Sequence, residues 1–245
     1  MRSLLYCRAG RQDHPNKEGF SLDIELHDTE AGQGKPLILL HGNGENNGYF
    51  KNQIPVFATR FHVFAPDTRG HGQTPRGEGA FTIRRFADDL AGFMDRHGLS
   101  RAHLLGFSDG ANIAMCFALK YPERVDKLIL NGGNLTPRGV KARYQLPIEI
   151  GYYAARLFSG KDERAKAKAE LLGLMVNDPF LSPHELAGIR AQTLVIAGTR
   201  DMIRTRHTRL IARSIPGAKL LFLKGDHFIA AKQSAAFNRA VLDFL

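Results

Sequence analysis

The chain has 245 residues, 43% of them hydrophobic, which is enough to build the core of one ordinary α/β domain. No apolar run approaches the roughly 18 residues of a membrane-spanning helix, and charge returns early, at Arg8. Cys7 lies in a polar segment and Cys116 in an expected helix, so a disulfide between them is a poor pairing. We therefore expect a soluble, cytoplasmic protein with one domain over residues 1–245.

The charge is strongly basic, because 34 Lys and Arg against 24 Asp and Glu give a formal net charge of +10. Clustered cations can neutralise the phosphates of a nucleic acid. Here they are spread along the chain, aromatic residues do not alternate with them, and no helix-turn-helix, RNA-recognition or zinc-finger spacing occurs. The charge indicates solubility first and steering of anionic substrates second. We expect neither nucleic acid nor a membrane as a partner, and the sequence leaves the oligomeric state open.

Apolar patterns in the first hundred residues alternate between strand and helix. Apolar side chains at Phe20, Leu22, Ile24 and Leu26 alternate with polar ones, which predicts a half-buried strand. The run at 37–40 is apolar throughout and too short for a helix, which indicates a strand covered on both faces. The expected elements of this part are strands over 20–26, 37–40 and 61–65 and helices over 48–59 and 82–98.

The alternation continues after residue 101 and is interrupted once. Residues 134–190 contain positively charged helical stretches at 147–158 and 161–176 and no strand-like run, so we expect a cap over the ligand-binding end. Alternating strands and helices imply a mostly parallel sheet that binds ligands beyond the C-terminal ends of its strands. The expected elements are strands over 102–105, 125–130, 193–197 and 219–223, helices over 111–118 and 205–214, and a final helix ending at Leu245.

The motif GFSDG at 106–110 lies between an apolar strand and a helix-forming run. A GxSxG turn in this setting is typical of a nucleophile elbow, which exposes the serine hydroxyl above the edge of the sheet. A Cβ at Gly106 or Gly110 would press on the neighbouring strand or on the first turn of the helix, so the spacing has a steric cause. Ser108 is therefore the candidate nucleophile.

A serine hydroxyl needs a base to take its proton and a carboxylate to orient that base. The order expected after an elbow serine is acid and then histidine, and the chain offers Asp201 and His227. Each follows a predicted strand by a short turn, so both lie at the same sheet edge as Ser108. The sequence predicts a catalytic triad of these three residues.

An oxyanion on the attacked carbonyl needs preorganised hydrogen-bond donors. The backbone amide of Asp109 directly follows the nucleophile, and the HGNG loop at 41–44 offers the amide of Asn43 as the second donor. A carboxylate at Asp109 could also pair with a substrate ammonium, although a favourable charge at the helix N-terminus explains it more simply.

Other histidines and acids near these motifs are interpreted as supports. We expect His41 to brace its loop, and Asp67 and His71 to hold the turn of PDTRGHG at 66–72. Asp226 adjoins His227 and competes for the acid role, but an adjacent residue is badly placed to grip the imidazole of its neighbour. No HxxxH, HExxH or CxxC spacing occurs, nor a Walker motif or a GxGxxG after a strand, so we predict no metal and no cofactor.

Taken together, the motifs closely resemble the α/β-hydrolase superfamily over nearly the whole chain from residue 20. The resemblance implies an eight-stranded, mostly parallel sheet flanked by helices, a helical lid at about 134–190, and a triad at Ser108, Asp201 and His227. One departure is Asp226, an extra acid directly before the histidine. The motifs that carry the likeness are HGNG at 41–44, DTRGHG at 67–72, GFSDG at 106–110, GTRDMI at 198–203 and GDHF at 225–228.

Members that resemble this chain include carboxylesterases, thioesterases, amino-acid ester hydrolases, carbon-carbon bond hydrolases and a few lyases. Ser108 argues against members with an aspartate nucleophile. We therefore expect a serine hydrolase that cleaves a small ester or thioester through an acyl-enzyme. A carbon-carbon bond hydrolase or lyase with the same triad is the second interpretation, and a non-catalytic ligand-binding protein on this scaffold is the third. Arg200, Arg204 and neighbouring cations favour an anionic substrate only weakly, because surface charge is usually solvated.

Overall fold

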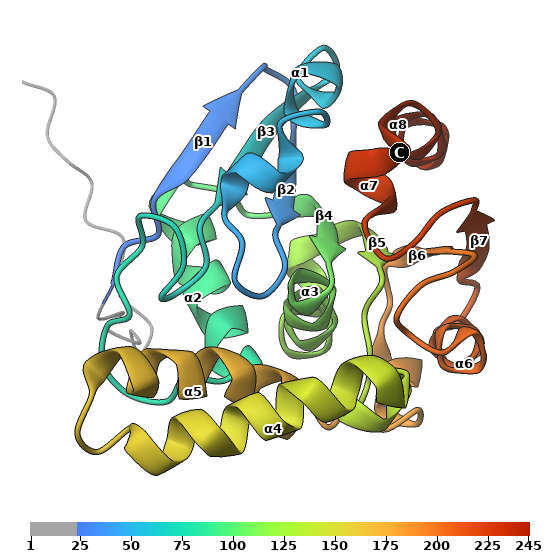
Figure 1. Ribbon diagram of the computed structural model, residues 1–245. Helices are drawn as coiled ribbons and strands as arrows, with labels where there is room; N and C mark the ends of the chain where they lie inside the picture. Colours follow the sequence, from blue (N-terminus) through green and yellow to red (C-terminus); the bar gives the residue numbers. More distant parts are fainter. Residues whose placement is uncertain (1–23) are drawn as a thin grey trace, which may run out of the picture.

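The computed structural model describes residues 24–245 (Figure 1). Within them seven strands form one sheet in the order β1-β3-β2-β4-β5-β6-β7. Every neighbouring pair is parallel except β1 and β3, which are antiparallel. The strands are β1 Asp28–Ala31, β2 Lys35–Leu40, β3 Phe61–Pro66, β4 Ala102–Phe107, β5 Val125–Asn131, β6 Gln192–Gly198 and β7 Lys219–Leu223.

Helices cover both faces of the sheet, so the central strands are largely apolar and buried toward their C-terminal ends. In β2, Ile38 and Leu40 enter one core and Leu37 and Leu39 enter the other, as the alternation of side chains in a strand requires. The first core includes side chains of α2 Ile83–Arg96, α3 Asp109–Lys120 and α6 Thr205–Ser214; the second includes side chains of α1 Ile54–Phe57, α7 Ile229–Lys232 and α8 Ser234–Phe244.

A buried ion pair fixes the loop after β3 to helix α2. Arg69 is fully buried, and its guanidinium donates two hydrogen bonds of 2.7 Å to the carboxylate of Asp89. The same guanidinium donates to the carbonyl oxygens of Arg76 and Glu78 at 3.0 Å. Removing one partner of such a pair costs about 3–5 kcal/mol, so this loop has a well-defined course beside the ends of the strands.

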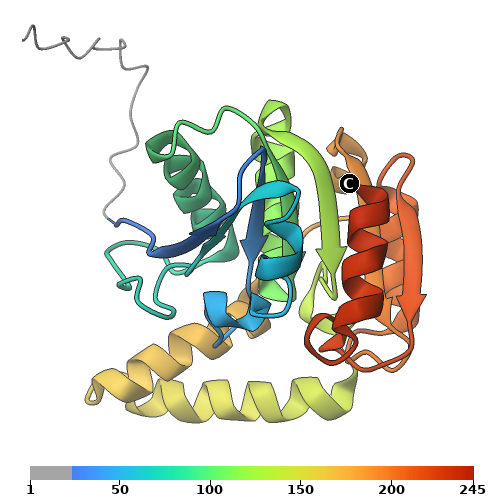
Figure 2. The ribbon, with the colours of Figure 1, turned by 90° about the horizontal axis from the view of Figure 1, so that it is seen from above.

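Two helices, α4 Ala142–Phe158 and α5 Glu163–Asn177, occupy the insertion between β5 and β6. Figure 2 shows them as a layer on the side of the molecule toward which β5 and β7 point. Helix α5 is tied to the body by an ion pair of 2.6 Å between Arg76 and Glu170 and by a hydrogen bond of 2.8 Å from Asn43 Nδ2 to the Leu171 carbonyl. No helix within residues 24–245 is long and apolar enough to cross a membrane.

Several predicted elements are corrected by the structure. Of the strand predicted over 20–26, residues 20–23 lie outside the described part, and residues 24–27 have no regular secondary structure although Ile24 and Leu26 are buried. The strand instead begins at Asp28, because pairing with β3 begins there, with Asp28 opposite Pro66. The described residues thus contain seven strands against the eight expected.

Two helices also differ from their predicted bounds. The helix predicted over 48–59 is divided into a 3-10 turn, Asn47–Phe50, and the short α1, because Pro55 has no N–H for a continuous helix. The first lid helix begins at Ala142 rather than at 147, and Pro147 is accommodated within it. Further 3-10 turns lie at Pro122–Arg124, Pro137–Gly139 and Glu185–Gly188.

The tight turn between β4 and α3 predicts that a side chain at Gly110 would destabilise the protein. A Cβ on Gly110 would lie 2.0 Å from the Leu40 carbonyl oxygen, a backbone atom that cannot give way cheaply. We expect Gly110→Ala to lower the free energy of unfolding by about 3 kcal/mol or more, measured by chemical denaturation. Gly160→Ala is the matched control, since a Cβ there meets nothing within 4 Å. Equal stability of the two variants would contradict the steric account.

Candidate active site

Ser108 occupies a strained backbone position between the last residue of β4 and the first residue of α3. Its φ of 54° and ψ of −118° lie in a region that residues with a side chain rarely adopt. The turn is tight: a Cβ on Gly106 would lie only 2.2 Å from the Gly110 carbonyl oxygen. Only glycine therefore fits at position 106, as at position 110. The Ser108 amide donates to the Asn131 carbonyl at 2.8 Å and so anchors the turn to the end of β5.

The structure brings the three predicted triad side chains together. His227 Nε2 lies 3.1 Å from Ser108 Oγ, and His227 Nδ1 lies 2.7 Å from Asp201 Oδ1. Asp201 Oδ1 also accepts from the Ile203 amide at 2.9 Å. Asp201 and His227 are both buried. A carboxylate bound to Nδ1 leaves Nε2 to face the serine, which is the tautomer a general base requires.

Two further residues support this arrangement in roles that the sequence did not predict. Gly132 has φ of 66°, and a Cβ there would lie 2.7 Å from His227 Cε1, so the glycine leaves room for the imidazole. Its place directly after strand β5 was the available signal. Lys141, which precedes α4, donates from Nζ to the backbone carbonyl of Asp201 and joins the lid to the acid loop. No local pattern indicates that contact.

The two residues whose amides are predicted to bind an oxyanion contact each other: the Asn43 side chain is bonded to Asp109, which directly follows the serine. Within residues 24–245 neither the Asn43 nor the Asp109 backbone N–H has a hydrogen-bond partner, so both are available to a ligand. The side chain of Asn43 has a separate task, because Nδ2 donates to Asp109 Oδ2 at 2.9 Å and to the Leu171 carbonyl at 2.8 Å. One residue therefore connects the HGNG loop, the elbow and helix α5.

The residues expected to brace the loops do so. His41 Nδ1 donates to the Gly42 carbonyl at 2.8 Å and Nε2 accepts from the Thr68 amide at 3.0 Å. Burial lowers the pKa of His41 to about 4, so its imidazole is neutral at pH 7. Asp67 is also buried and accepts from the amides of Asn47 and Gln73 at 2.7 and 2.9 Å.

His71 and Asp226 likewise have partners of their own. His71 Nδ1 donates to the Arg69 carbonyl at 2.9 Å, which holds the turn as predicted. Asp226 is bonded by the Phe228 amide at 2.9 Å and forms an ion pair with Lys232, and the Lys232 ammonium holds the pKa of Asp226 below its usual value. The carboxylate of Asp226 is thus bonded to other groups, whereas that of Asp201 contacts His227 Nδ1, so the structure favours Asp201 as the partner of the imidazole.

Two neighbouring acidic residues, Asp109 directly after the serine and Asp178, have raised pKa values. Asp109 is buried, and burial raises its pKa, while hydrogen bonds from Asn43 and from Asn112 Nδ2 (3.2 Å) favour the charged form. Asp178, at the end of α5, is half-buried; burial and the nearby charge of Asp109 raise its pKa to about 6. Asp178 lines a cavity of about 320 Å³ together with Phe81, Tyr152 of α4 and residues of α5.

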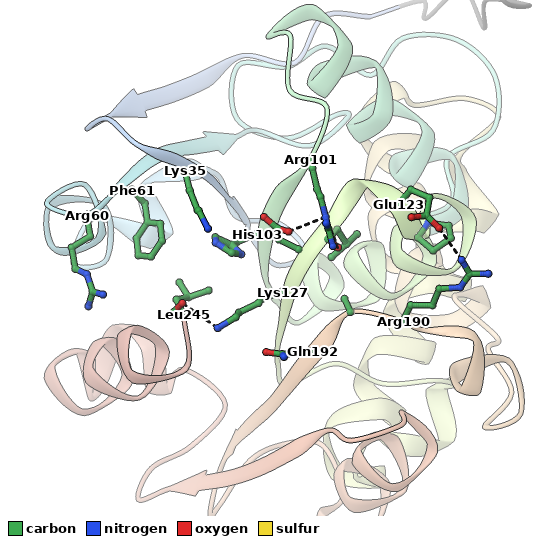
Figure 3. Close-up of a pocket in the computed structure, with 14 residues that line it drawn as sticks. Lys35, Arg60, Phe61, Arg101, His103, Glu123, Lys127, Arg190, Gln192 and Leu245 are labelled. Carbon is green, nitrogen blue, oxygen red and sulfur yellow. Dashed lines mark hydrogen bonds and ion pairs between the residues drawn. The ribbon is translucent and has the colours of Figure 1, made fainter.

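A second cavity, of about 570 Å³, opens at the opposite end of the sheet, where the parallel strands begin (Figure 3). Its cations are largely paired: Arg101 contacts Asp126 and Arg190 contacts Glu123, each at 2.8 Å. Lys127 Nζ donates to the Phe244 carbonyl at 2.7 Å. This cavity lies far from the triad and has no part in its chemistry.

Comparison with known proteins supports the same fold and a hydrolase. A family model described as the alpha/beta hydrolase fold matches residues 35–148. A 2-hydroxy-6-oxononadienedioate/2-hydroxy-6-oxononatrienedioate hydrolase of Burkholderia vietnamiensis is 30% identical over 94% of this chain and 93% of its own length. A 2-hydroxy-6-oxo-6-phenylhexa-2,4-dienoate hydrolase of Burkholderia cepacia is 28% identical, with 94% of each chain covered.

Solved structures give the same result. A meta-cleavage product hydrolase from Pseudomonas fluorescens superimposes with a TM-score of 0.73 at 25% identity, covering 90% of this chain and 94% of that one. Est816, described as an N-acyl homoserine lactone degrading enzyme, does so with a TM-score of 0.76 at 25% identity, covering 91% and 97%. The seven-stranded sheet, the elbow and these relatives agree, and the chain belongs to the α/β-hydrolase superfamily.

Proposed function

We propose that this hydrolase cleaves a small carboxylic ester or thioester through an acyl-enzyme intermediate. The observation that carries the proposal is the continuous chain of contacts from Ser108 Oγ to His227 (3.1 Å) and from His227 to Asp201 (2.7 Å). A serine hydroxyl in this geometry can lose its proton to the imidazole as it attacks a carbonyl carbon.

The geometry supports a two-step mechanism. His227 Nε2 takes the proton of Ser108 as Oγ bonds to the acyl carbon, and Asp201 stabilises the imidazolium that forms. The amides of Asn43 and Asp109 are the donors for the oxyanion. When the tetrahedral intermediate collapses, the leaving alkoxide or thiolate takes the proton from His227. Water then attacks the acyl-enzyme with His227 as base, which releases the acid and restores the serine.

Carbon-carbon bond hydrolysis is the second candidate, and the relatives favour it. Several of them, at 28–30% identity and with more than nine tenths of both chains covered, carry names of dienoate and dienedioate hydrolases. A triad with the same geometry could assist such a cleavage, with His227 as the main base.

The charge around the serine supports the ester over these anionic substrates. The names of the relatives denote carboxylates, some of them dicarboxylates. In this chain the carboxylate of Asp109 directly follows the nucleophile, and Asp178 adds a second carboxylate near it. Like charges in a partly desolvated site repel, so an ester that is neutral or cationic near the scissile bond fits this site better than a dianion.

The role of Ser108 can be tested by substitution. We expect Ser108→Ala to lower kcat for short p-nitrophenyl esters about 10⁴-fold or more and to abolish labelling by a fluorophosphonate, read as intact mass. Ser214→Ala is the control, because that exposed hydroxyl bonds only the Leu210 carbonyl of its own helix. Labelling of Ser108→Ala, or full activity in it, would refute the assignment. Labelling of the wild type with no ester turnover, but with cleavage of a vinylogous diketone, would favour carbon-carbon hydrolysis.

The charge preference should depend on Asp109. Asn at this position keeps an oxygen that can accept from Asn43, but it removes the negative charge beside Ser108. We expect Asp109→Asn to raise kcat/KM for the anionic mono-p-nitrophenyl glutarate about tenfold relative to neutral p-nitrophenyl hexanoate, because about 1.4 kcal/mol of repulsion is relieved. The neutral ester serves as the internal reference. An unchanged ratio would show that Asp109 does not select by charge.

The raised pKa of Asp178 predicts a pH-dependent stability. The unfolded chain releases this proton near its ordinary value of 3.8, whereas the folded protein holds it to about 6. The folded state therefore binds more protons between about pH 4 and pH 6, and ionisation of Asp178 lowers stability as the pH rises through this range. The Asp178→Asn variant cannot ionise at this position, so it does not lose stability in this way.

We expect the melting temperature of Asp178→Asn, relative to the wild type, to rise by about 2–4 °C between pH 4.5 and pH 7. The control is Asp243→Asn, since that side chain is exposed on α8. A difference from the wild type that is constant over this range would contradict the prediction.

A further inference from the structure

Helix α4 presents a stripe of large apolar side chains to the outside of the molecule. Leu146, Ile150, Tyr153 and Leu157 are 56%, 69%, 57% and 81% exposed. Such a contiguous apolar face on a surface helix marks an interaction site rather than ordinary surface. We call these four residues the α4 stripe.

The opposite side of the helix is the one that packs on the body. A Cβ on Gly151 would meet Leu172 of α5 at 3.2 Å, and Tyr152 accepts a hydrogen bond from Asn177 of α5 through its hydroxyl, at 3.2 Å. Figures 1 and 2 show α4 as the outer edge of the molecule, with α5 between it and part of the sheet. Among the described residues 24–245, no element lies over the α4 stripe.

The spacing of the stripe matches a helix partner. Its residues are separated by four, three and four positions, which is the repeat that packs one helix along another. The spacing also reads the same in both directions. If a second copy of α4 lies antiparallel to the first, Leu146 meets Leu157 of the partner subunit and Ile150 meets Tyr153 of the partner subunit. By symmetry each of these two contacts occurs twice. A stripe with this property is complementary to itself.

The residues beside the stripe have the same self-complementarity in charge. Glu149 and Arg156 flank it on one side, seven positions apart, while Pro147 and Ala154 flank it on the other. In the antiparallel arrangement each Glu149 lies beside Arg156 of the partner subunit, so two ion pairs form. Within the described part of the chain Arg156 has no acidic partner, and Glu149 accepts a hydrogen bond from Gln145 Nε2 at 3.0 Å.

We propose that two copies of this chain associate through α4, antiparallel about a twofold axis that passes between Ile150 and Tyr153. The interface consists of the α4 stripe of each copy, bordered by two ion pairs between Glu149 and Arg156. A single helix pair buries less area than a large obligate interface, so the dimer forms reversibly and its population rises with protein concentration. Because α4 is part of the layer over the triad, the dimer also restrains that layer. This proposal stands apart from the proposed reaction.

The test is sedimentation velocity of the full chain between about 5 and 300 µM, with a charge exchange as the decisive comparison. The wild type should pass from monomer to dimer over this range. Glu149→Arg or Arg156→Glu alone places like charges together and should weaken dimerisation about tenfold or more, whereas the double variant should return to within about threefold of the wild type. Only a contact between these two positions in different copies predicts that rescue.

An apolar test accompanies it. Ile150→Asp should leave the protein monomeric at all these concentrations, while Leu210→Asp, at an exposed leucine of α6, should behave as the wild type. Far-ultraviolet circular dichroism and a thermal melt confirm that each variant is folded.

Three results would overturn the proposal. These are a wild type that remains monomeric at 300 µM, a dimer that persists in Ile150→Asp, and no rescue in the double charge variant. A monomer whose α4 stripe variants lose binding to phosphatidylglycerol vesicles would instead assign the stripe to a lipid surface.

Discussion

The close approach of two backbone segments at Gly110 is the constraint on which the site depends. The position that a Cβ would take there is already occupied by the Leu40 carbonyl, so helix α3 can begin against the end of β2 only with glycine. Gly106 satisfies the same requirement within the turn itself. With both ends of the turn held in this way, Ser108 has no relaxed alternative to its positive φ. The strain at the nucleophile is sustained by packing that extends through the centre of the sheet.

The sheet order explains how residues far apart in sequence meet at that serine. Ser108 follows β4, while Asp201 and His227 follow β6 and β7, two and three places along the sheet. Strand β5 lies between them, so the imidazole has to pass over its C-terminal end. Gly132 stands at that point, and the space its missing side chain leaves is filled by the ring of His227. The triad therefore requires glycine at the C-terminal ends of two different strands.

Elements that have a local sequence pattern could be predicted, whereas contacts between distant segments could not. Strands β2 to β7 each contain a short run of mainly apolar residues, so these strands and the loops after them, with Ser108, Asp201 and His227, could be located from the sequence. The alternation at 20–26 is less specific, because an extended segment can bury Ile24 and Leu26 without pairing; only contact with β3 decides where β1 begins. The pairs that tie α5 to the body, such as Arg76 with Glu170, join segments 94 residues apart and have no local signal.

Asn43 shows how such contacts join structure to chemistry. Its backbone amide is a donor for the oxyanion in the proposed mechanism, and its side chain bridges Asp109 and the Leu171 carbonyl of α5. The two amides of the oxyanion site therefore belong to residues that are bonded to each other through their side chains. The buried carboxylate of Asp109 loses hydration, and the amides of Asn43 and Asn112 offset part of that loss. Since α5 supplies one acceptor of Asn43, the position of the lid layer and the geometry of the proposed oxyanion site are physically coupled.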